Sequence, residues 1–233
     1  LIQNFPKASP AALAEAHFLL GRAAFDQGDF KSSISHMAEA KTLDPQKYGE
    51  QVNVLSVLSY HKLQDMNKLK EALETLQKEN PSAVARVPDV IPAWLGLQAY
   101  GMKDLETADK YMTWATQNDQ LQNVKKVIWR NLAKVRLALK KYDRALVASN
   151  NFLKVEDQPY RRADGMLDKA SILLGLGKYS DARKTAEEAL ERLGVRRIIP
   201  LAVAVLGAAR GPLLVRTHHG FVVRGSHDDA VLV

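Results

Sequence analysis

Apolar and small residues recur at helical spacing along most of the chain, and charged residues fill the positions between them. The opening segment reads Ala14-Glu-Ala-His-Phe-Leu-Leu-Gly21, and a glycine-containing turn, Gly28-Asp-Phe30, follows it. Ser9-Pro10 is typical of a helix start, because serine caps the first turn and proline fits the first helical position. Asp44-Pro45 and Asn80-Pro81 mark helix ends. The pattern therefore predicts pairs of helices joined by short turns.

The pattern repeats with a period of about 37 residues, which indicates a solenoid built from stacked copies of one helical unit. Five repeats start near Ala14, Asn53, Asp89, Lys126 and Ala163. The intervals between these starts are 39, 36, 37 and 37 residues. Each interval is long enough for two helices and the turns that join them.

The first repeat resembles the tetratricopeptide repeat, a helical hairpin of about 34 residues. With Ala14 as repeat position 1, Leu20-Gly21 falls at positions 7 and 8, Gly28 at 15 and Phe30 at 17. All of these are choices typical of the family. The resemblance implies an all-α fold, a right-handed superhelical solenoid of about five such hairpins with a divergent C-terminal tail.

Repeat positions 8, 20 and 27 lie where neighbouring helices touch closely, so only small side chains fit there. Twelve of these fifteen positions hold Gly, Ala or Ser, against about 3.5 expected from the 54 such residues among 233. The small residues are Gly21, Ser33, Ala40, Ala72, Gly96, Ala108, Ala115, Ala133, Ala145, Ala170, Ala182 and Ala189. Position 17 holds the large residues Phe30, Leu69, Leu105, Tyr142 and Tyr179. The count favours the repeat over a generic helical bundle, which is the alternative.

The chain divides into a lead-in at residues 1–13, a repeat array at 14–194 and a tail at 195–233. The tail lacks Lys and Glu, while Arg, Val and Gly become common in it. A sixth repeat, 37 residues after the fifth, would start at Pro200. Pro200 to Ala209 is therefore expected to form a partial first helix that covers the end of the fifth repeat. Residues 212–233 show no strand-like alternation and are expected to be irregular or disordered.

Composition narrows the functional classes only a little. The chain is 46% hydrophobic and 25% charged, which is ordinary for a globular protein. It has no cysteine, which excludes disulfides, thiolate zinc sites and thiol nucleophiles. Of the net charge of +7, the tail contributes +3 and the other residues only +4, which argues against a nucleic-acid partner. The longest apolar run, Ile198 to Ala209, has 12 residues and is too short to span a bilayer.

A helical solenoid usually binds its partner on the concave face, which the first helix of each pair forms. Repeat positions 2, 5, 9 and 12 are expected to face it. In the first two repeats these positions hold Glu15, Phe18, Arg22, Phe25, Val54, Val57, His61 and Gln64. In the other three they hold Val90, Ala93, Leu97, Tyr100, Val127, Arg130, Lys134, Leu137, Asp164, Leu167, Ser171 and Leu174. The predicted partner-binding residues are Phe18, Arg22, Phe25, His61, Leu97, Tyr100, Arg130 and Lys134.

Part of this face is basic, and the cations concerned are Arg22, His61, Arg130 and Lys134. Cationic donors beside apolar groups suit an extended or helical peptide that bears carboxylates. The alternative is that these cations are ordinary solvated helix surface. One branch of the family grips a C-terminal carboxylate with Lys and Asn. Arg130, Asn131 and Lys134 suit that clamp, but Phe18 and Arg22 do not, so it is not expected.

Motifs for catalysis and cofactor binding are missing from the sequence. There is no glycine-rich phosphate loop, no His-Glu-x-x-His zinc motif and no Gly-x-Ser-x-Gly elbow. We therefore expect no enzyme activity, no cofactor and no metal site. His218-His219 and His227-Asp228-Asp229 are potential ligands, but they lie in the tail. His17 and His36 fall at helix positions and are expected to pack or to face water.

Phe5-Pro-Lys-Ala-Ser-Pro10, followed by Ala14 to Gly21, is similar to a linker of bacterial cell-envelope repeat proteins. These include outer-membrane assembly lipoproteins and the Tol–Pal-associated periplasmic coordinator. The similarity covers about 20 residues and implies an adaptor in the bacterial periplasm or cell envelope, with the cytoplasm as the alternative. The chain starts at Leu1 rather than Met, so we expect a fragment or a processed product.

Together these patterns predict a non-catalytic protein–protein interaction scaffold that binds a peptide or helix in its concave groove. Two alternatives stay open. One is a nucleic-acid-binding helical solenoid, which the pI of 9.5 suggests, and the other is the repeat segment of a larger envelope or secretion assembly protein. The expected partner is a protein or peptide, and an exposed face on the last repeat leaves homo-oligomer formation open.

Overall fold

A computed structural model describes residues 8–117, 122–193, 214–217 and 220–223. The helices within these residues are α1 (Pro10–Asp26), α2 (Phe30–Leu43), α3 (Pro45–Lys62), α4 (Met66–Glu79), η2 (Pro81–Arg86, a 3₁₀ helix), α5 (Val90–Gly101), α6 (Leu105–Ala115), α7 (Gln122–Ala138), α8 (Tyr142–Val155), α9 (Pro159–Gly175) and α10 (Tyr179–Arg192). The strands are β1 (Leu214–Thr217) and β2 (Gly220–Val223). None of the described helices is both long and apolar enough to cross a membrane.

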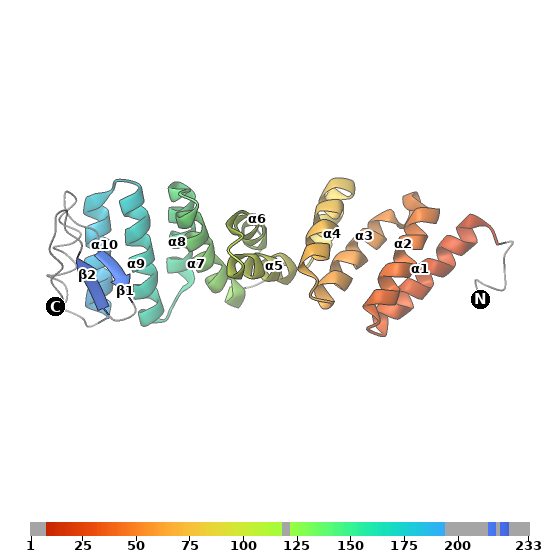
Figure 1. Cartoon of the computed structure of the whole chain (residues 1–233), viewed down its shortest axis with the longest axis horizontal. Coiled ribbons are helices and arrows are strands. Elements are labelled where there is room, and N and C mark those ends of the chain that lie inside the picture. Colours follow the sequence, from red (N-terminus) through yellow and green to blue (C-terminus); the bar gives the residue numbers. More distant parts are fainter. Residues whose placement is uncertain (1–7, 118–121, 194–213, 218–219, 224–233) are drawn as a thin grey trace. The chain divides into compact units, whose positions relative to one another are not determined.

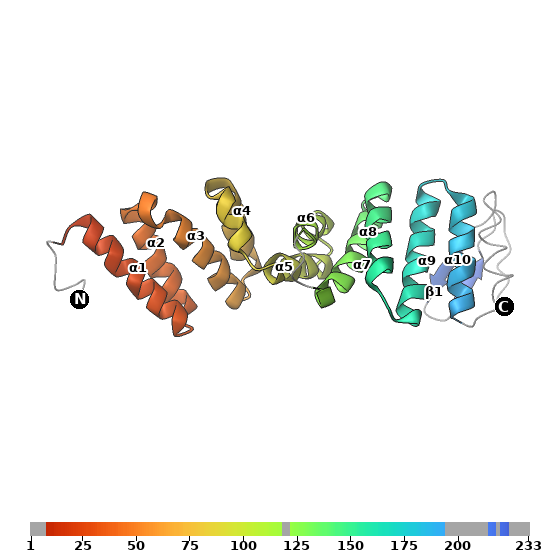
Figure 2. The ribbon, with the colours of Figure 1, turned by 180° about the vertical axis from the view of Figure 1, so that it is seen from behind.

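Consecutive helices pack in pairs, as Figures 1 and 2 show for α1 with α2, α3 with α4, α7 with α8 and α9 with α10. Neighbouring hairpins also touch, because α2 packs on α3 and α8 packs on α9. The predicted all-α array of helical hairpins is therefore confirmed. The chain forms two compact units, Leu1–Gln98 and Ala99–Val233, and the boundary lies inside α5.

Short polar side chains cap the start of five of the described helices, α1, α2, α3, α4 and α6. Ser9 precedes Pro10 and accepts a hydrogen bond from the amide three residues on, as predicted. Asp44 ends α2 and also caps α3, because its carboxylate accepts a hydrogen bond from an amide of the first turn. The same cap starts α2, α4 and α6, where the residues are Asp29, Asp65 and Asp104. The helix ends predicted at Asp44-Pro45 and Asn80-Pro81 are confirmed.

The second hairpin, however, lies three residues earlier than the sequence pattern predicted. α4 begins at Met66, so Met66 rather than Leu69 takes repeat position 17, and the repeat starts near residue 50. The turn before α4 agrees, because Gln64 has the positive φ of 55° that belongs to repeat position 15. Position 15 in the other repeats has the same left-handed conformation at Gly28, Lys103, Lys140 and Gly177.

Close packing of larger side chains explains why the predicted register of the second repeat was wrong by three residues. Eleven of the twelve small residues predicted at close contacts are buried, and only Ala72 of the second repeat is half-buried. In the shifted register the close-contact positions of that repeat hold Val57, Leu69 and Leu76, all 0% exposed. Larger side chains therefore serve in this repeat where small ones serve elsewhere, and the search for small residues selected the wrong register.

Bulky residues and glycines also complement one another across the hairpins. In the first hairpin, a Cβ on Gly21 would lie 3.0 Å from Cγ of Met37, so α1 and α2 approach closely there. In the fourth repeat Phe152 replaces the small residue at position 27. It fits because α9 has Gly165 opposite, where an added Cβ would overlap the phenyl ring.

The tail contains a short antiparallel pair of strands, in which Leu214 lies opposite Val223 and Thr217 opposite Gly220. The sequence shows no strand-like alternation in residues 212–233, so these two strands were not expected from it. Such strands are stabilised by pairing with each other, and the periodicity of one four-residue run cannot reveal a pairing. The capping helix predicted at Pro200 to Ala209 lies outside the described residues.

Candidate binding groove

A groove lies between α1 and α3 in the first unit, and we call it the α1–α3 groove. Its lining residues are Phe18, Arg22, Phe25, Asp26, Gln51, Val54, Leu55, Leu58 and Arg86. Three of the predicted partner-binding residues, Phe18, Arg22 and Phe25, thus lie together. Val54, which was predicted for the same face, lies with them.

The repeat register explains why these side chains converge. Phe18, Arg22 and Phe25 occupy positions 5, 9 and 12 on α1. With the second repeat starting near residue 50, Gln51, Val54 and Leu58 occupy positions 2, 5 and 9 on α3. Equivalent faces of two first helices therefore line the groove, which is the arrangement expected of a concave face.

Five lining residues were missed by the sequence prediction; two of them, Asp26 and Leu55, occupy repeat positions 13 and 6, which were not expected to face the groove. Gln51 and Leu58 were missed through the register error, and aligning Asp65 with the cap residue Asp29 would have found both. Arg86 was missed because η2 lies between repeats and has no repeat position. Val57, predicted for the face, is 0% exposed instead and belongs to the core.

Neighbouring rings hold the aromatic residues of the groove in place. Phe18 stacks on Tyr48, with ring centres 4.8 Å apart and planes 26° from parallel. Phe25 meets Phe30 edge to face at 5.5 Å. Leu55 packs against the cluster of buried residues that includes Tyr48. Rings fixed by such contacts lose little conformational entropy on binding, so the apolar surface is pre-organised.

Two arginines flank this apolar surface, and each already has a carboxylate beside it. Arg22 Nε lies 3.7 Å from Asp26, and both side chains are more than half exposed. Arg86 donates a hydrogen bond of 2.6 Å to Glu50, and this pair is also exposed to solvent. Exposed pairs of this kind are weak, so a carboxylate of a ligand can replace either partner.

The other predicted residues of the first unit lie outside the groove. The ring of His61 meets Trp94 edge to face at 5.5 Å. Burial, with a smaller contribution from the charge of Lys62, lowers the pKa of His61 below its ordinary value, which favours the neutral imidazole. Leu97 is half-buried on α5, and so is Tyr100, which lies on the same helix just inside the second unit.

In the second unit Arg130 and Lys134 of α7 face carboxylates of α9. Arg130 forms ion pairs with Asp164 and Asp168, and Lys134 Nζ lies 3.6 Å from Asp168. The Arg130 guanidinium also lies 5.9 Å from the centre of the Phe152 ring. Burial raises the pKa of Asp168, and the two cations oppose this shift. Two cations therefore meet two carboxylates here. Sequence reasoning had placed Asp164 on this face but had missed Asp168.

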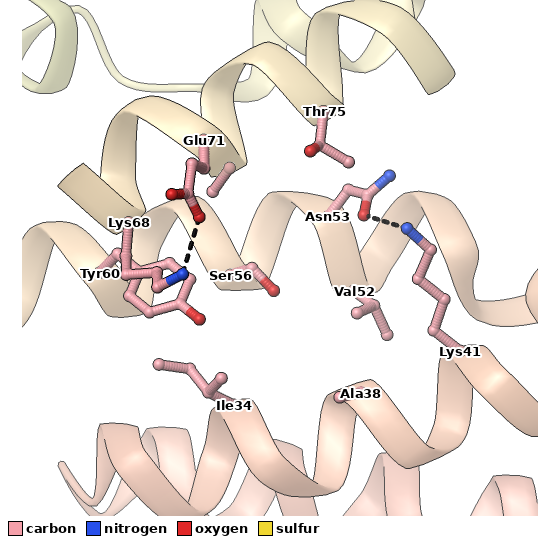
Figure 3. A pocket seen from close by; sticks show the side chains of 11 residues that line it. Ile34, Ala38, Lys41, Val52, Asn53, Ser56, Tyr60, Lys68, Glu71 and Thr75 are labelled. Carbon is pink, nitrogen blue, oxygen red and sulfur yellow. Dashed lines mark hydrogen bonds and ion pairs between the residues drawn. The ribbon is translucent and has the colours of Figure 1, made fainter.

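Two further grooves involve the second helices of the hairpins. The α2–α4 groove, drawn in Figure 3, is lined by Ile34, Ala38, Lys41, Val52, Asn53, Ser56, Tyr60, Lys68, Glu71, Ala72 and Thr75. The α8–α10 groove is lined by Asn150, Leu153, Lys154, Arg162, Met166, Lys169, Thr185, Glu188 and Arg192. No residue predicted for the concave face lines either of them.

Potential metal ligands are sparse in the described part of the chain, where no three His, Asp or Glu side chains gather in a way that could hold an ion. His17 and His36 pack against each other between α1 and α2, with their Nδ1 atoms 3.0 Å apart. The candidate ligands His218-His219 and His227-Asp228-Asp229 lie outside the described residues.

Comparison with known families agrees with the hairpin architecture. A tetratricopeptide repeat profile matches residues 14–47, and a tetratricopeptide repeat-like domain profile matches residues 93–205. The comparison with curated proteins found no match. The crystal structure of MamA protein is 16% identical, with 77% of this chain and 91% of that chain covered and a TM-score of 0.44. The crystal structure of BtubC from P. vanneervenii is 18% identical and has a TM-score of 0.42. The match covers 81% of this chain and 82% of that chain. The structure of PilF of Pseudomonas aeruginosa is 16% identical and has a TM-score of 0.38. The match covers 86% of this chain and 89% of that chain.

Proposed function

Because the chain belongs to the tetratricopeptide repeat family, we propose that it is a scaffold that binds a peptide or helix of a partner protein in the α1–α3 groove. Repeats of this family are typically protein-interaction scaffolds and are generally non-catalytic. The absence of catalysis in this chain is part of the proposal. The observation that carries the proposal is that Phe18 and Phe25 of α1 meet Val54 and Leu58 of α3 in one groove.

The side chains of the groove suggest the chemistry of its ligand. Its floor is apolar and aromatic, so an amphipathic segment would bury apolar side chains against Phe18, Phe25 and Leu58. Arg22 and Arg86 flank that floor, and each would exchange its exposed carboxylate partner for a carboxylate of the ligand. Apolar contacts would supply most of the affinity, and the arginines would orient the segment.

The test is a selection of binders from a phage-displayed library of random peptides on the full chain. Selected peptides are then titrated against Leu58→Glu, which places a charge on the apolar floor. Leu19→Glu is the matched control, because Leu19 lies on α1 at 59% exposure and does not line the groove. Circular dichroism checks that both variants keep their helices.

The proposal expects a class of amphipathic peptides whose affinity for Leu58→Glu falls by about tenfold or more, as for an apolar anchor at an interface centre. The same peptides should bind Leu19→Glu as they bind the unchanged chain. Arg22→Glu should weaken peptides that carry a carboxylate more than peptides that lack one. Recovery of no peptide that distinguishes Leu58→Glu from Leu19→Glu would overturn the proposal.

We propose that the paired charges of α7 and α9 form a separate contact surface within the second unit. A partner that reaches Arg130 and Lys134 must also meet Asp164 and Asp168, so a segment with both signs of charge suits this region. Arg130→Ala with Lys134→Ala should then weaken binding of the physiological partner. Unchanged affinity would remove these two residues from the surface.

We also propose that the protein acts in the bacterial periplasm or cell envelope. This rests on the similarity of residues 5–21 to the linker of envelope repeat proteins. Fractionation of the source cells with an antibody to the chain tests it. Recovery with periplasmic and membrane fractions supports the proposal, and recovery with cytoplasmic markers overturns it.

A further inference from the structure

The α2–α4 and α8–α10 grooves are the same feature of the repeat with different side chains. Each is formed by the second helix of one hairpin and both helices of the next. The register of α4 makes Lys41, Asn53 and Glu79 the repeat equivalents of Leu153, Met166 and Arg192. Ser56 is likewise the equivalent of Lys169. Two copies of one groove can therefore be compared position by position.

In the first copy a hydrogen-bond network occupies these positions. Lys41 Nζ donates to Asn53 at 2.8 Å and to Glu79 at 2.7 Å. Asn53 in turn donates to Glu79 at 2.9 Å and to Asn80 at 2.7 Å. Figure 3 shows the bond between Lys41 and Asn53 and, on the opposite side of the view, a second pair, Lys68 with Glu71. The cations of the α2–α4 groove are therefore already satisfied within the protein.

In the second copy the network is replaced by apolar side chains. Leu153 and Met166 take the places of Lys41 and Asn53, and Arg192 takes the place of Glu79. The α8–α10 groove thus exchanges a polar centre for an apolar one and reverses the charge at its edge. Met166 is only 7% exposed and forms the floor of the groove, while Leu153 is half-buried.

The α8–α10 groove is lined by more positively than negatively charged side chains. Four of its lining residues are cations and only Glu188 is an acid. Arg162 has a structural role, because its guanidinium caps the carbonyl groups of Leu153 and Glu156. Lys154 and Arg192 are exposed and Lys169 is half-exposed. In the described part of the second unit no carboxylate lies within ion-pair distance of these three, whereas Lys126 and Lys141 have carboxylates at 2.7–3.0 Å.

An apolar strip between unpaired cations selects one kind of ligand. Acidic side chains would pair with Lys154, Lys169 and Arg192, while an apolar side chain would cover Leu153 and Met166. Nucleic acid fits less well, because single strands need aromatic side chains for stacking and none lines this groove. We propose that the α8–α10 groove is a second docking site, which binds an acidic segment of a partner protein that carries at least one large apolar residue.

In the test, peptides are selected from a phage-displayed random library on the full chain. Their affinities are then compared between the full chain and a graft variant, in which residues of the first unit replace those of the α8–α10 groove. Lys154→Thr, Lys169→Ser and Arg192→Glu together introduce the residues that the first unit has at the equivalent positions, Thr42, Ser56 and Glu79. The repeat tolerates those residues, so the variant is expected to fold. The matched control, Lys31→Thr with Arg144→Glu and Lys184→Ser, makes the same change in charge at exposed residues that line no groove named above.

The expected result is a class of acidic peptides with an apolar residue that bind the graft variant about tenfold or more weakly, because each exposed ion pair changes an equilibrium by up to about fivefold. These peptides should bind the control variant and Leu58→Glu normally, so failure here is distinguishable from failure of the α1–α3 groove. The proposal is overturned if acidic peptides bind the graft variant and the control equally. It is also overturned if oligo(dT) binds through the same three residues and competes with the peptides, since the groove would then select phosphate.

Discussion

The two units of the chain use the same hairpin but satisfy their charged groups in different places. In the first unit Lys41 and Asn53 line the α2–α4 groove and bond to Glu79 at its edge, and the Lys41 and Glu79 side chains are 29% and 46% exposed. In the second unit Arg136 and Asp109 form an ion pair of 2.8 Å in which both side chains are only 9% exposed.

Repeat numbering makes this comparison direct. Asp109 and Arg136 occupy the positions that Ile34 and Tyr60 occupy in the first unit, where both line the α2–α4 groove. One helix contact can therefore be apolar or ionic without a change of fold, whereas the surface chemistry beside it changes completely. Repeat geometry determines where a groove lies, and a few side chains determine what it can bind.

The largest expected effect comes from breaking the buried pair. Asp109→Ala should destabilise the second unit by about 3–5 kcal/mol, because it leaves the Arg136 charge buried with too few partners. Urea unfolding followed by far-ultraviolet circular dichroism measures this loss. Ile34→Ala is the equivalent change in the first unit and should cost less, since Ile34 is only half-buried. Equal losses in the two variants would contradict the assigned role of the ion pair.

A second comparison uses glycines of the two units. Gly165→Ala should destabilise the protein by about 1–3 kcal/mol, because the new Cβ overlaps the ring of Phe152 and the helices must separate. Gly49 of α3 has nothing within 4 Å of the same added atom, so Gly49→Ala should stabilise the protein by up to about 1 kcal/mol. Thermal unfolding of both variants gives the two signs, and a stabilising Gly165→Ala would show that α8 and α9 do not approach this closely.

Converting one groove into the other should have a smaller effect, on binding rather than on stability. Thr42→Lys, Ser56→Lys and Glu79→Arg together give the α2–α4 groove the cations that the α8–α10 groove has at the equivalent positions. This variant should gain about tenfold in affinity for the acidic peptides selected on the α8–α10 groove. The affinity is measured in a chain that also carries Lys154→Thr, Lys169→Ser and Arg192→Glu, so that the α8–α10 groove does not contribute. No gain at all would show that these three positions do not control the specificity of the groove.

The smallest effect concerns acid stability of the first unit. Hydrogen bonds from Lys41 and Asn53 hold the pKa of Glu79 below its ordinary value of 4.5. A carboxyl group with a lowered folded pKa stabilises the protein above the unfolded value, and this stabilisation is lost as the pH falls through the folded value. Below pH 4.5 the melting temperature of the unchanged chain should therefore fall more steeply than that of Glu79→Gln. The extra loss should be no more than about 2–4 °C, because the group is exposed. Parallel pH profiles would contradict the network.

Most of the fold follows from the sequence because small residues, caps and turns repeat together. Ser9, Asp44 and Asn80 mark helix ends correctly, and eleven of the predicted small residues are buried. The second repeat failed because Val57, Leu69 and Leu76 take close contacts that small residues take elsewhere. Only the aspartate caps carried the correct register there.

The lining of the candidate groove could be predicted only in part. Phe18, Arg22 and Phe25 followed from repeat positions, since α1 presents one face along its length. Arg86 could not be predicted, because η2 belongs to no repeat. The pairing of Arg130 with Asp168 depends on how α7 and α9 face each other, and a helical pattern within one segment does not contain that information.

The central claim is that the chain binds separate peptide segments at the α1–α3 and α8–α10 grooves. The most direct measurement is calorimetric titration of a peptide selected on one groove into the chain saturated with a peptide selected on the other. We predict that each peptide binds once, with an affinity that the other does not change. Leu58→Glu should remove only the first binding event, and Lys154→Thr with Lys169→Ser and Arg192→Glu only the second. Competition between the two peptides, or loss of both in either variant, would contradict the account.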